Sequence, residues 1–154
     1  MKLIYPSILT FFVLSCIACD KQEKDANEKN NLLNTVWMAS LIDDNPDTNP
    51  PGDFGFSGDN LYFPWLACHL DDSFTFTAGK LIIDSNGTDC EEGTGSVFEA
   101  KDQSYTYNSD RKQLTIETVA GNVTLQVYEV NQLRLKVGFP IPMGGNMVFL
   151  FKRK

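Results

Sequence analysis

The sequence predicts an all-β fold, in the form of an eight-stranded antiparallel up-and-down barrel. Apolar and polar residues alternate with a period of two in eight short segments. Turn-like pairs, such as Ala78-Gly79 and Ala120-Gly121, separate several of these segments. No stretch after residue 19 has convincing helical periodicity. Because short antiparallel strands must protect their edges, closure into a barrel is the economical arrangement, and a flattened sandwich of the same strands is the alternative.

Seven of the eight predicted strands follow one another closely after residue 72. They span residues 35–42, 73–78, 80–84, 103–108, 113–117, 122–129, 132–137 and 146–152. One row of apolar residues in each strand is expected to face the barrel interior. These rows include Phe74/Phe76, Leu114/Ile116, Val123/Leu125/Val127 and Leu133/Leu135/Val137. A hairpin turning about Gly79 would place Phe76 opposite Ile82, and the same symmetry relates Cys68 to Cys90.

The first 19 residues have the features of an export signal. A single cation, Lys2, precedes an uncharged and mostly apolar run at residues 3–19, which contains Pro6 and is short for a membrane span of roughly 20 residues. The run gives way abruptly to "DKQEKDANEKNN", residues 20–31, which is charged and nearly free of large apolar side chains. This composition predicts a disordered tether, and the folded domain is expected at residues 32–154.

The end of the signal, "FVLSCIACDKQ", resembles the lipobox of bacterial lipoproteins, in which cleavage occurs just before a cysteine that carries lipid. Cys16 follows Val13 and Ser15, an aliphatic-then-small pattern, and is the favoured attachment site. Cys19 follows Ala18 and is the alternative site, while an ordinary cleaved signal peptide would give a soluble product. We expect an exported protein that is anchored by its N-terminal lipid to the bacterial cell envelope, at the outer membrane.

The charge balance disfavours nucleic acid as a partner. Lys2 is the only one of the 13 basic residues within the signal, so the exported part carries 12 basic and 20 acidic residues, a net charge of −8. Such a field repels phosphate backbones. The basic end "FKRK" is short, and we interpret it as a solvated strand end.

Cys68 and Cys90 are the two cysteines of the predicted domain, and we expect them to form a disulfide. An exported protein folds where thiols oxidise, and closing this loop would contribute roughly 3 kcal/mol. A structural zinc site is disfavoured because it needs about four ligands and His69 is the one histidine of the chain. A thiol enzyme would need His69 oriented against a free cysteine, whereas His69 is expected at the surface or in a loop.

Residues 43–72 form a long segment that is rich in Pro, Gly and Asp. Long irregular segments in compact domains often act as lids or binding loops. Its aromatic residues are the candidate lid if a ligand binds, but the preferred interpretation is that they cap the core. These residues are Phe54, Phe56, Tyr62, Phe63 and Trp65.

Two acidic patterns are candidates for polar sites. Asp43, Asn45, Asp47 and Asn49 alternate like the oxygen ligands of a calcium loop. However, Thr48 replaces the required glycine and Phe54 replaces the bidentate acid, so a solvated turn is the preferred interpretation. The adjacent acidic pairs at 71–72 and 91–92 point opposite ways in an extended chain and do not predict a hydrolase. We expect no enzyme activity, metal or cofactor.

These segments together resemble the lipocalin-like domain found in bacterial lipoproteins. The resemblance rests on "NLLNTVWMAS" as first strand, on the cysteine-flanked hairpin "CHLDDSFTFTAGKLIIDSNGTDC", and on the final meander to "FLFKRK". It departs from the family at Thr35, where a Gly-x-Trp signature has glycine, and Trp37 is expected to plug the core. The resemblance implies a non-enzymatic protein that binds a small apolar ligand inside the barrel. The alternative is a cell-envelope interaction or accessory domain with a filled core and a protein partner that the sequence does not identify.

Overall fold

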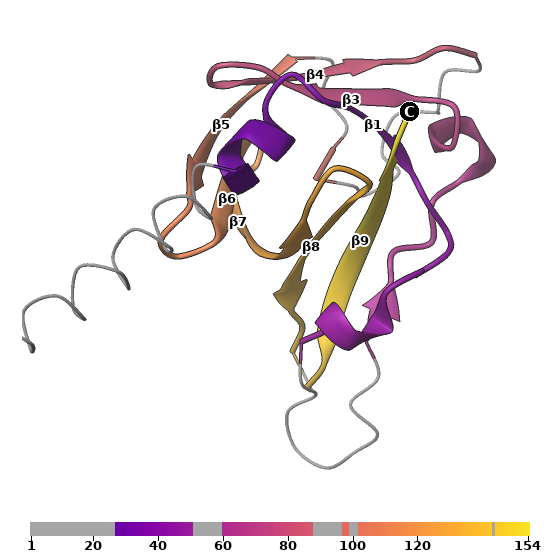
Figure 1. Cartoon of the computed structure of the whole chain (residues 1–154), viewed down its shortest axis with the longest axis vertical. Coiled ribbons are helices and arrows are strands. Elements are labelled where there is room, and N and C mark those ends of the chain that lie inside the picture. Colours follow the sequence, from indigo (N-terminus) through magenta and orange to yellow (C-terminus); the bar gives the residue numbers. More distant parts are fainter. Residues whose placement is uncertain (1–26, 51–59, 88–96, 99–101, 143) are drawn as a thin grey trace, which may run out of the picture.

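In the described part of the chain, eight strands form a closed antiparallel barrel and one further strand lies outside it (Figure 1). The structure is a computed structural model that describes residues 27–50, 60–87, 97–98, 102–142 and 144–154. The strands are β1 (Val36–Ala39), β2 (Leu61–Tyr62), β3 (Ser73–Phe76), β4 (Lys80–Asp84), β5 (Asp102–Asn108), β6 (Gln113–Thr118), β7 (Gly121–Val130), β8 (Arg134–Pro140) and β9 (Asn146–Arg153). Two short 3₁₀ helices, η1 (Pro46–Thr48) and η2 (Ala67–His69), lie in the long connection between β1 and β3.

The predicted fold class is confirmed. The eight predicted strands correspond to β1 and to β3 through β9, and each pairs with its neighbour in sequence around the barrel. β9 also pairs with β1, where Trp37 lies opposite Arg153 and Ala39 opposite Phe151. This pairing closes the sheet, so the arrangement is a barrel rather than the alternative sandwich.

The extra strand β2 was not predicted. It has two residues, Leu61 and Tyr62, and both are exposed, so the sequence contains no alternation that would mark it. β2 runs parallel to the N-terminal part of β9, opposite Met147 and Val148, while β1 pairs with the C-terminal part of β9. One edge of β9 is therefore shared by two strands, and in Figure 1 β2 and η1 lie near the end of β9 that is farther from the C-terminus.

The register of the β3–β4 hairpin differs by one residue from the predicted register. Phe76 lies opposite Leu81 rather than Ile82. A backbone hydrogen bond of 2.7 Å closes the turn around two residues, Ala78 and Gly79, so the centre of the turn falls between them. Gly79 has φ of +80°, a conformation that glycine adopts readily. The symmetry that related the two cysteines of the domain is therefore displaced by one residue.

The prediction that Leu133 faces the barrel interior is wrong. Its side chain is 64% exposed, because β8 begins only at Arg134. Leu133 lies in the preceding turn, where the side-chain oxygen of Asn131 accepts hydrogen bonds from the backbone N–H groups of Leu133 and Arg134 at 2.8 and 2.9 Å. A turn held by an asparagine side chain thus interrupts the alternation that the sequence suggested.

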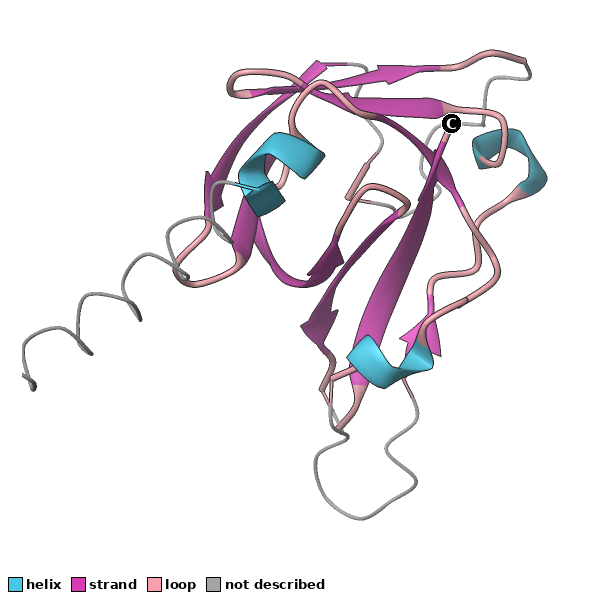
Figure 2. Ribbon diagram, in the orientation of Figure 1, coloured by secondary structure: helices cyan, strands magenta, loops and turns pink. Residues whose placement is uncertain are grey.

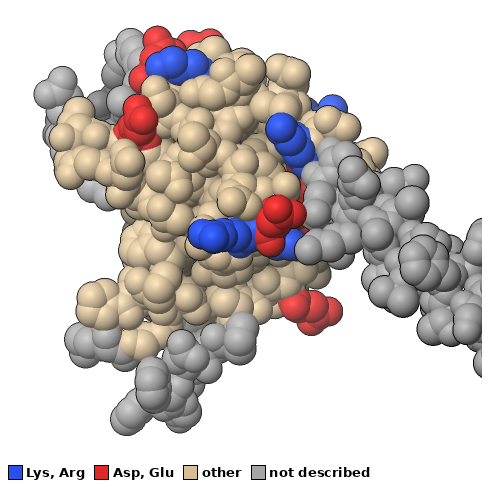
Figure 3. Space-filling view, turned by 90° about the vertical axis from the view of Figure 1, so that its left-hand side faces the viewer, with Lys and Arg blue, Asp and Glu red and all other residues tan. Residues whose placement is uncertain are grey.

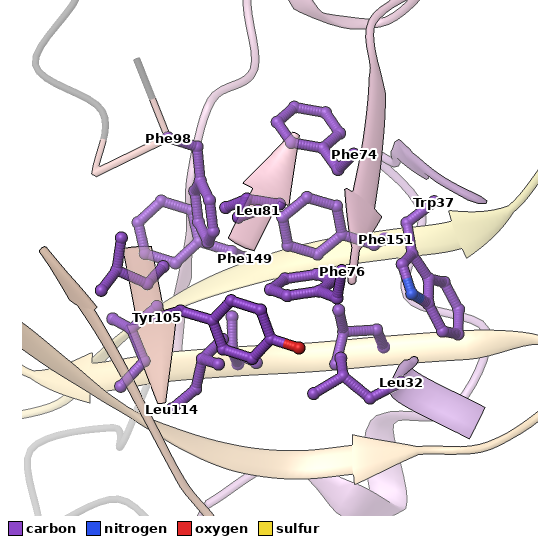
Figure 4. Packing of buried hydrophobic residues seen from close by; sticks show 14 of the residues in the cluster. Leu32, Trp37, Phe74, Phe76, Leu81, Phe98, Tyr105, Leu114, Phe149 and Phe151 are labelled. Atoms are coloured by element: carbon purple, nitrogen blue, oxygen red, sulfur yellow. The ribbon is translucent and has the colours of Figure 1, made fainter. Parts of the chain in front are cut away.

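Side chains from all eight barrel strands pack together in the interior (Figure 4). Trp37, the predicted core plug, is fully buried. Leu32, Trp65 and Phe98 enter the same cluster from outside the barrel strands. The aromatic rings contact one another at close range: the Phe74 and Phe151 centroids, for example, are 5.2 Å apart. Among the described residues, no helix has the length and apolar character needed to span a membrane.

Residues 27–32 are helical and lie against one end of the barrel (Figure 2). Leu32 is 1% exposed, and the following Leu33 forms a bridge with Phe76 at the end of β3. Glu28 accepts a hydrogen bond from the Lys112 ammonium at 3.2 Å. We call this the helix end of the barrel. It also contains the β3–β4, β5–β6 and β7–β8 turns and the C-terminus, because successive antiparallel strands return to it.

Candidate functional site

A pocket of about 390 Å³ lies at the helix end, between the N-terminal helical residues, the β3–β4 turn and β5. Its volume is within the range of small-molecule sites, roughly 300–1,000 Å³. The lining residues are Lys29, Leu32, Leu33, Ala78, Gly79, Tyr105, Thr106 and Tyr107. Most of this wall is aliphatic or aromatic, so the pocket is suited to an apolar group.

The β3–β4 turn and β5 are fixed to each other at this pocket. The Tyr105 N–H donates to the Gly79 carbonyl at 3.1 Å, and the Tyr105 hydroxyl donates to the Thr77 carbonyl at 2.7 Å. Burial raises the pKa of Tyr105 to about 12, so the phenol stays neutral over the physiological range. Lys29, an exposed helical residue, is the one charged residue among those that line the pocket. The site therefore offers a neutral apolar wall with one cation at its margin.

The barrel interior, where the resemblance placed a ligand, is occupied by aromatic side chains. The Trp65 ring lies 5.3 Å from that of Phe151 and 5.7 Å from that of Phe74. Phe98 packs against Phe149 with ring centroids 5.3 Å apart. Each of these five rings is at most 5% exposed. Such an arrangement resembles a packed protein core rather than an open calyx.

The predicted lid residues do not gather over one opening. Phe54 and Phe56 lie outside the described residues. Trp65 is buried in the interior, and Phe63 stacks on Phe149 with centroids 4.8 Å apart. Tyr62 is 40% exposed and lies on the outer wall beside β9. Of the described members, two therefore belong to the packing of the core and one to the surface.

The candidate calcium residues surround an ammonium group supplied by the protein itself. Lys136, on the outer face of β8, is only 2% exposed because residues 43–49 cover it; we call these residues the strap. The Lys136 Nζ contacts the two carboxylate oxygens of Asp43 at 2.9 and 3.0 Å. It also donates to the Asn45 carbonyl at 2.7 Å and to the Asn49 Oδ1 at 2.8 Å. The cation that these oxygens hold is therefore the lysine side chain.

Asp43 is ionised within this cluster. Burial would raise the pKa of Asp43, but hydrogen bonds from Lys136, Tyr62, the Asn45 N–H and Asn49 lower it below its ordinary value of 3.8. Asp47, the remaining candidate ligand, is exposed in η1. No group of three or more histidine, cysteine or acidic side chains is placed to bind a metal ion in the described part of the chain.

A second buried charge, Glu129 on β7, accepts hydrogen bonds from the other side of the strap. It lies directly across from the buried lysine in the β7–β8 pair. Its carboxylate accepts hydrogen bonds from Asn45 Nδ2 at 3.1 Å, Thr48 Oγ1 at 3.0 Å and Arg134 Nε at 3.1 Å. Burial would raise the pKa of Glu129, but these hydrogen bonds lower it below its ordinary value of 4.5. The strap thus rests on an opposite-charge pair that belongs to neighbouring strands.

Sequence reasoning missed both of these charges and most of the pocket. Lys136 and Glu129 occupy outward positions in alternating strands, where a charged residue normally indicates a solvated face. The pocket residues come from three segments, and no local pattern distinguishes Tyr105 or Tyr107 from other outward or inward strand residues. The strap covers the two charges, and the helix completes the pocket, through contacts with distant segments of the closed barrel.

Cys68 lies in η2, and its predicted partner Cys90 is outside the described residues, so the disulfide stays a prediction. The candidate lipid-attachment residues Cys16 and Cys19 are outside them too. His69 is the last residue of η2, in the long connection between β1 and β3, and it is only 4% exposed, so it does not lie at the surface as expected. Its ring packs against Trp65 with centroids 5.7 Å apart, so its role in the described structure is packing.

No family model, curated protein or solved structure matches this chain. The closed barrel with sequential strand order is consistent with a lipocalin-like fold, and this likeness rests on the strand topology alone.

Proposed function

We propose that this protein is an exported, lipid-anchored and non-enzymatic domain of the bacterial cell envelope that binds a small apolar ligand at the helix end of its barrel. The pocket of about 390 Å³ beside the helical residues is the observation that carries this proposal. Its wall is mostly apolar, and its volume suits a small molecule. Binding at the helix end differs from binding inside the barrel, because aromatic rings occupy the interior.

A filled-core interaction domain is the second candidate. The packed interior favours it, since a barrel with no ligand would be expected to fill its own core. Leu61 and Leu66, near the outer strand β2, are about half exposed and offer apolar surface to a protein. The two candidates differ in one respect that can be measured: only the first requires saturable binding in the pocket.

The test uses a fluorescent fatty acid as the probe and titrates it into the purified chain. We expect saturable binding of one probe per chain. Thr106, an exposed residue of β5, lines the pocket, so Thr106→Trp should fill part of the pocket and weaken binding at least about tenfold. The matched control is Ile82→Trp on β4, which places the same ring at an exposed position outside the pocket.

The outcomes separate the candidates. Weaker binding for Thr106→Trp and unchanged binding for Ile82→Trp would support the pocket. No saturable binding, or equal effects of the two variants, would remove the pocket as the site and leave the interaction domain. The anchor is tested separately: labelling of the full chain with radioactive palmitate should be lost in Cys16→Ser, whereas loss only in Cys19→Ser would identify the alternative site.

A further inference from the structure

The charges of the described barrel are strongly segregated. Eight of the nine described basic residues belong to the helix end, and the ninth is Lys136, which is buried beneath the strap. The eight are Lys29, Lys80, Arg111, Lys112, Arg134, Lys152, Arg153 and Lys154. The described segments that form this end, residues 27–36, 77–80, 108–113, 130–134 and 152–154, contain two acidic residues, Glu28 and Asp110, and two more, Glu129 and Asp44, lie beside Arg134 at its margin. This end is therefore basic in a protein whose net charge is −7.

Two of these cations are paired and the others are available to a partner. Lys112 pairs with Glu28, and Arg134 pairs with Glu129. No salt bridge within the described residues involves the other six, and all six are exposed. Figure 3 shows basic side chains on this side of the molecule, together with acidic ones, on a surface that is mostly uncharged.

The opposite end of the barrel has the opposite character. It contains the β6–β7 turn and the end of β4, where Glu117 and Asp84 are exposed. Asp71 and Asp72 precede β3 at this same end. Among the described residues there is no lysine or arginine at the opposite end, so the two ends of the barrel would respond differently to a charged surface.

The chain also enters the barrel at the basic end. Asn27, the first helical residue described, follows Cys19 by 8 positions and Cys16 by 11. Even fully extended, such a connection spans at most about 40 Å, at roughly 3.6 Å per residue. A lipid on either cysteine would therefore keep the helix end close to the bilayer.

We propose that the helix end of the barrel is a docking surface for an anionic phospholipid bilayer. This inference rests on the lipid anchor of the proposed function, which limits how far the barrel can move from the membrane. Basic residues near an anionic leaflet are attracted to it over about one Debye length. The barrel thus stands with its basic end on the lipid and its acidic end directed away. The pocket at the helix end then opens next to the membrane surface.

Vesicle sedimentation tests the surface without the anchor. The fragment of residues 20–154 contains every described strand and core residue, and it lacks the signal and both candidate lipidation sites. We expect it to bind vesicles of phosphatidylcholine with phosphatidylglycerol at low salt, to bind phosphatidylcholine vesicles far less, and to be released by added salt.

Two double variants test which end of the barrel binds the vesicles. Arg111→Ala/Lys154→Ala removes two exposed cations from the basic end, and we expect binding to weaken by about twenty-fivefold, at about fivefold for each cation. Val119→Glu/Asn122→Glu lowers the net charge by the same two units at the opposite end, where both residues are exposed in or beside the β6–β7 turn. We expect this control to weaken binding less than about threefold, since its charges lie beyond a Debye length.

Three results would overturn the proposal: no binding to the anionic vesicles, equal binding to both kinds of vesicle, or equal weakening by the two double variants. Equal melting temperatures of the fragment and both variants would show that they are comparably folded. The probe titration uses no vesicles and the palmitate labelling uses the full chain. Failure of the docking surface can therefore be distinguished from failure of either part of the proposed function.

Discussion

Replacing Lys136 with methionine tests whether one buried ammonium holds the strap, residues 43–49, on the barrel. The ammonium contacts four oxygen atoms at 2.7 to 3.0 Å, and the side chains of Lys136 and Asp43 are 2% and 8% exposed. Methionine preserves most of the apolar stem but leaves these acceptors without their donor. Removing one partner of a buried ion pair costs about 3–5 kcal/mol, so we expect Lys136→Met to lower the free energy of unfolding by about that amount.

The assay is urea unfolding followed by the fluorescence of Trp37 and Trp65, both of which are buried. The control is Lys80→Met, which removes an exposed ammonium that donates a hydrogen bond to the Ser104 hydroxyl at 2.9 Å; we expect a change within about 0.5 kcal/mol. Adding Asp43→Leu to Lys136→Met should recover at least about 1 kcal/mol, since the unpaired carboxylate is then gone.

The reasoning would be refuted if Lys136→Met cost less than about 1 kcal/mol. That result would mean that the strap reorganises easily and that its oxygens find water. Failure of the double variant to recover any stability would show instead that the loss comes from packing of the lysine stem rather than from the unpaired charge.

Three further changes probe the core, the second buried charge and the sheet, and a fourth probes the predicted disulfide. Trp65→Ala should cost about 3–5 kcal/mol in urea unfolding because it empties the centre of the aromatic cluster. The pKa of Glu129 is lowered from 4.5 by folding, so its ionised form stabilises the fold above pH 4.5. This stabilisation is lost as the pH falls through the lower pKa of the folded state. Glu129→Gln should therefore flatten the acid limb of a plot of melting temperature against pH. Gly138→Ala should cost about 1–3 kcal/mol, since the added Cβ would meet the backbone carbonyl of the paired strand β9. Cys68→Ser should remove the predicted link to Cys90 and about 3 kcal/mol of stability, measured by unfolding without reductant.

Three of these changes have a control that separates the mechanism from a general loss of stability. Leu66→Ala alters a half-exposed neighbour of Trp65 and should have little effect. Glu117→Gln removes an exposed acid from β6 and should leave the acid limb unchanged. Wild type and Cys68→Ser should unfold alike in reductant; a difference that persists there would contradict a disulfide as the cause.

Much of the fold followed from local pattern. The strand segments were predicted nearly to their ends, because a period of two reports directly which side chains face a buried surface. Sequential connections through tight turns then predicted the strand order. The expectation that Trp37 plugs the core came from the resemblance of its strand to a lipocalin-like first strand, and this side chain is buried. Errors arose where a side chain or a turn overrides alternation, as at Leu133, whose turn is held by Asn131, and at the two-residue turn after β3.

The candidate site followed from the sequence only in fragments. The alternating oxygen residues Asp43, Asn45 and Asn49 were recognised as a group suited to a cation, but the sequence offered no means of finding a partner some 90 residues away. Trp65 was expected either in a lid or in a cap over the core, and the structure places it at the centre of the core. A long irregular segment has no period, so only the packing of its side chains against the closed sheet decides which face they take.

The sequence by itself determined that this chain forms short antiparallel strands connected in sequential order, because apolar alternation and turn residues act over a few neighbouring positions. The choice between a barrel and a sandwich was made by the pairing of β1 with β9. Its charges alone determined only an acidic protein. Tertiary structure decided where those charges lie: closure of the barrel brought eight cations from five separate segments to one end, and placed Lys136 and Glu129 beneath the strap. Electrostatic fields and buried ion pairs depend on distances through space, and those distances exist only once the chain has folded.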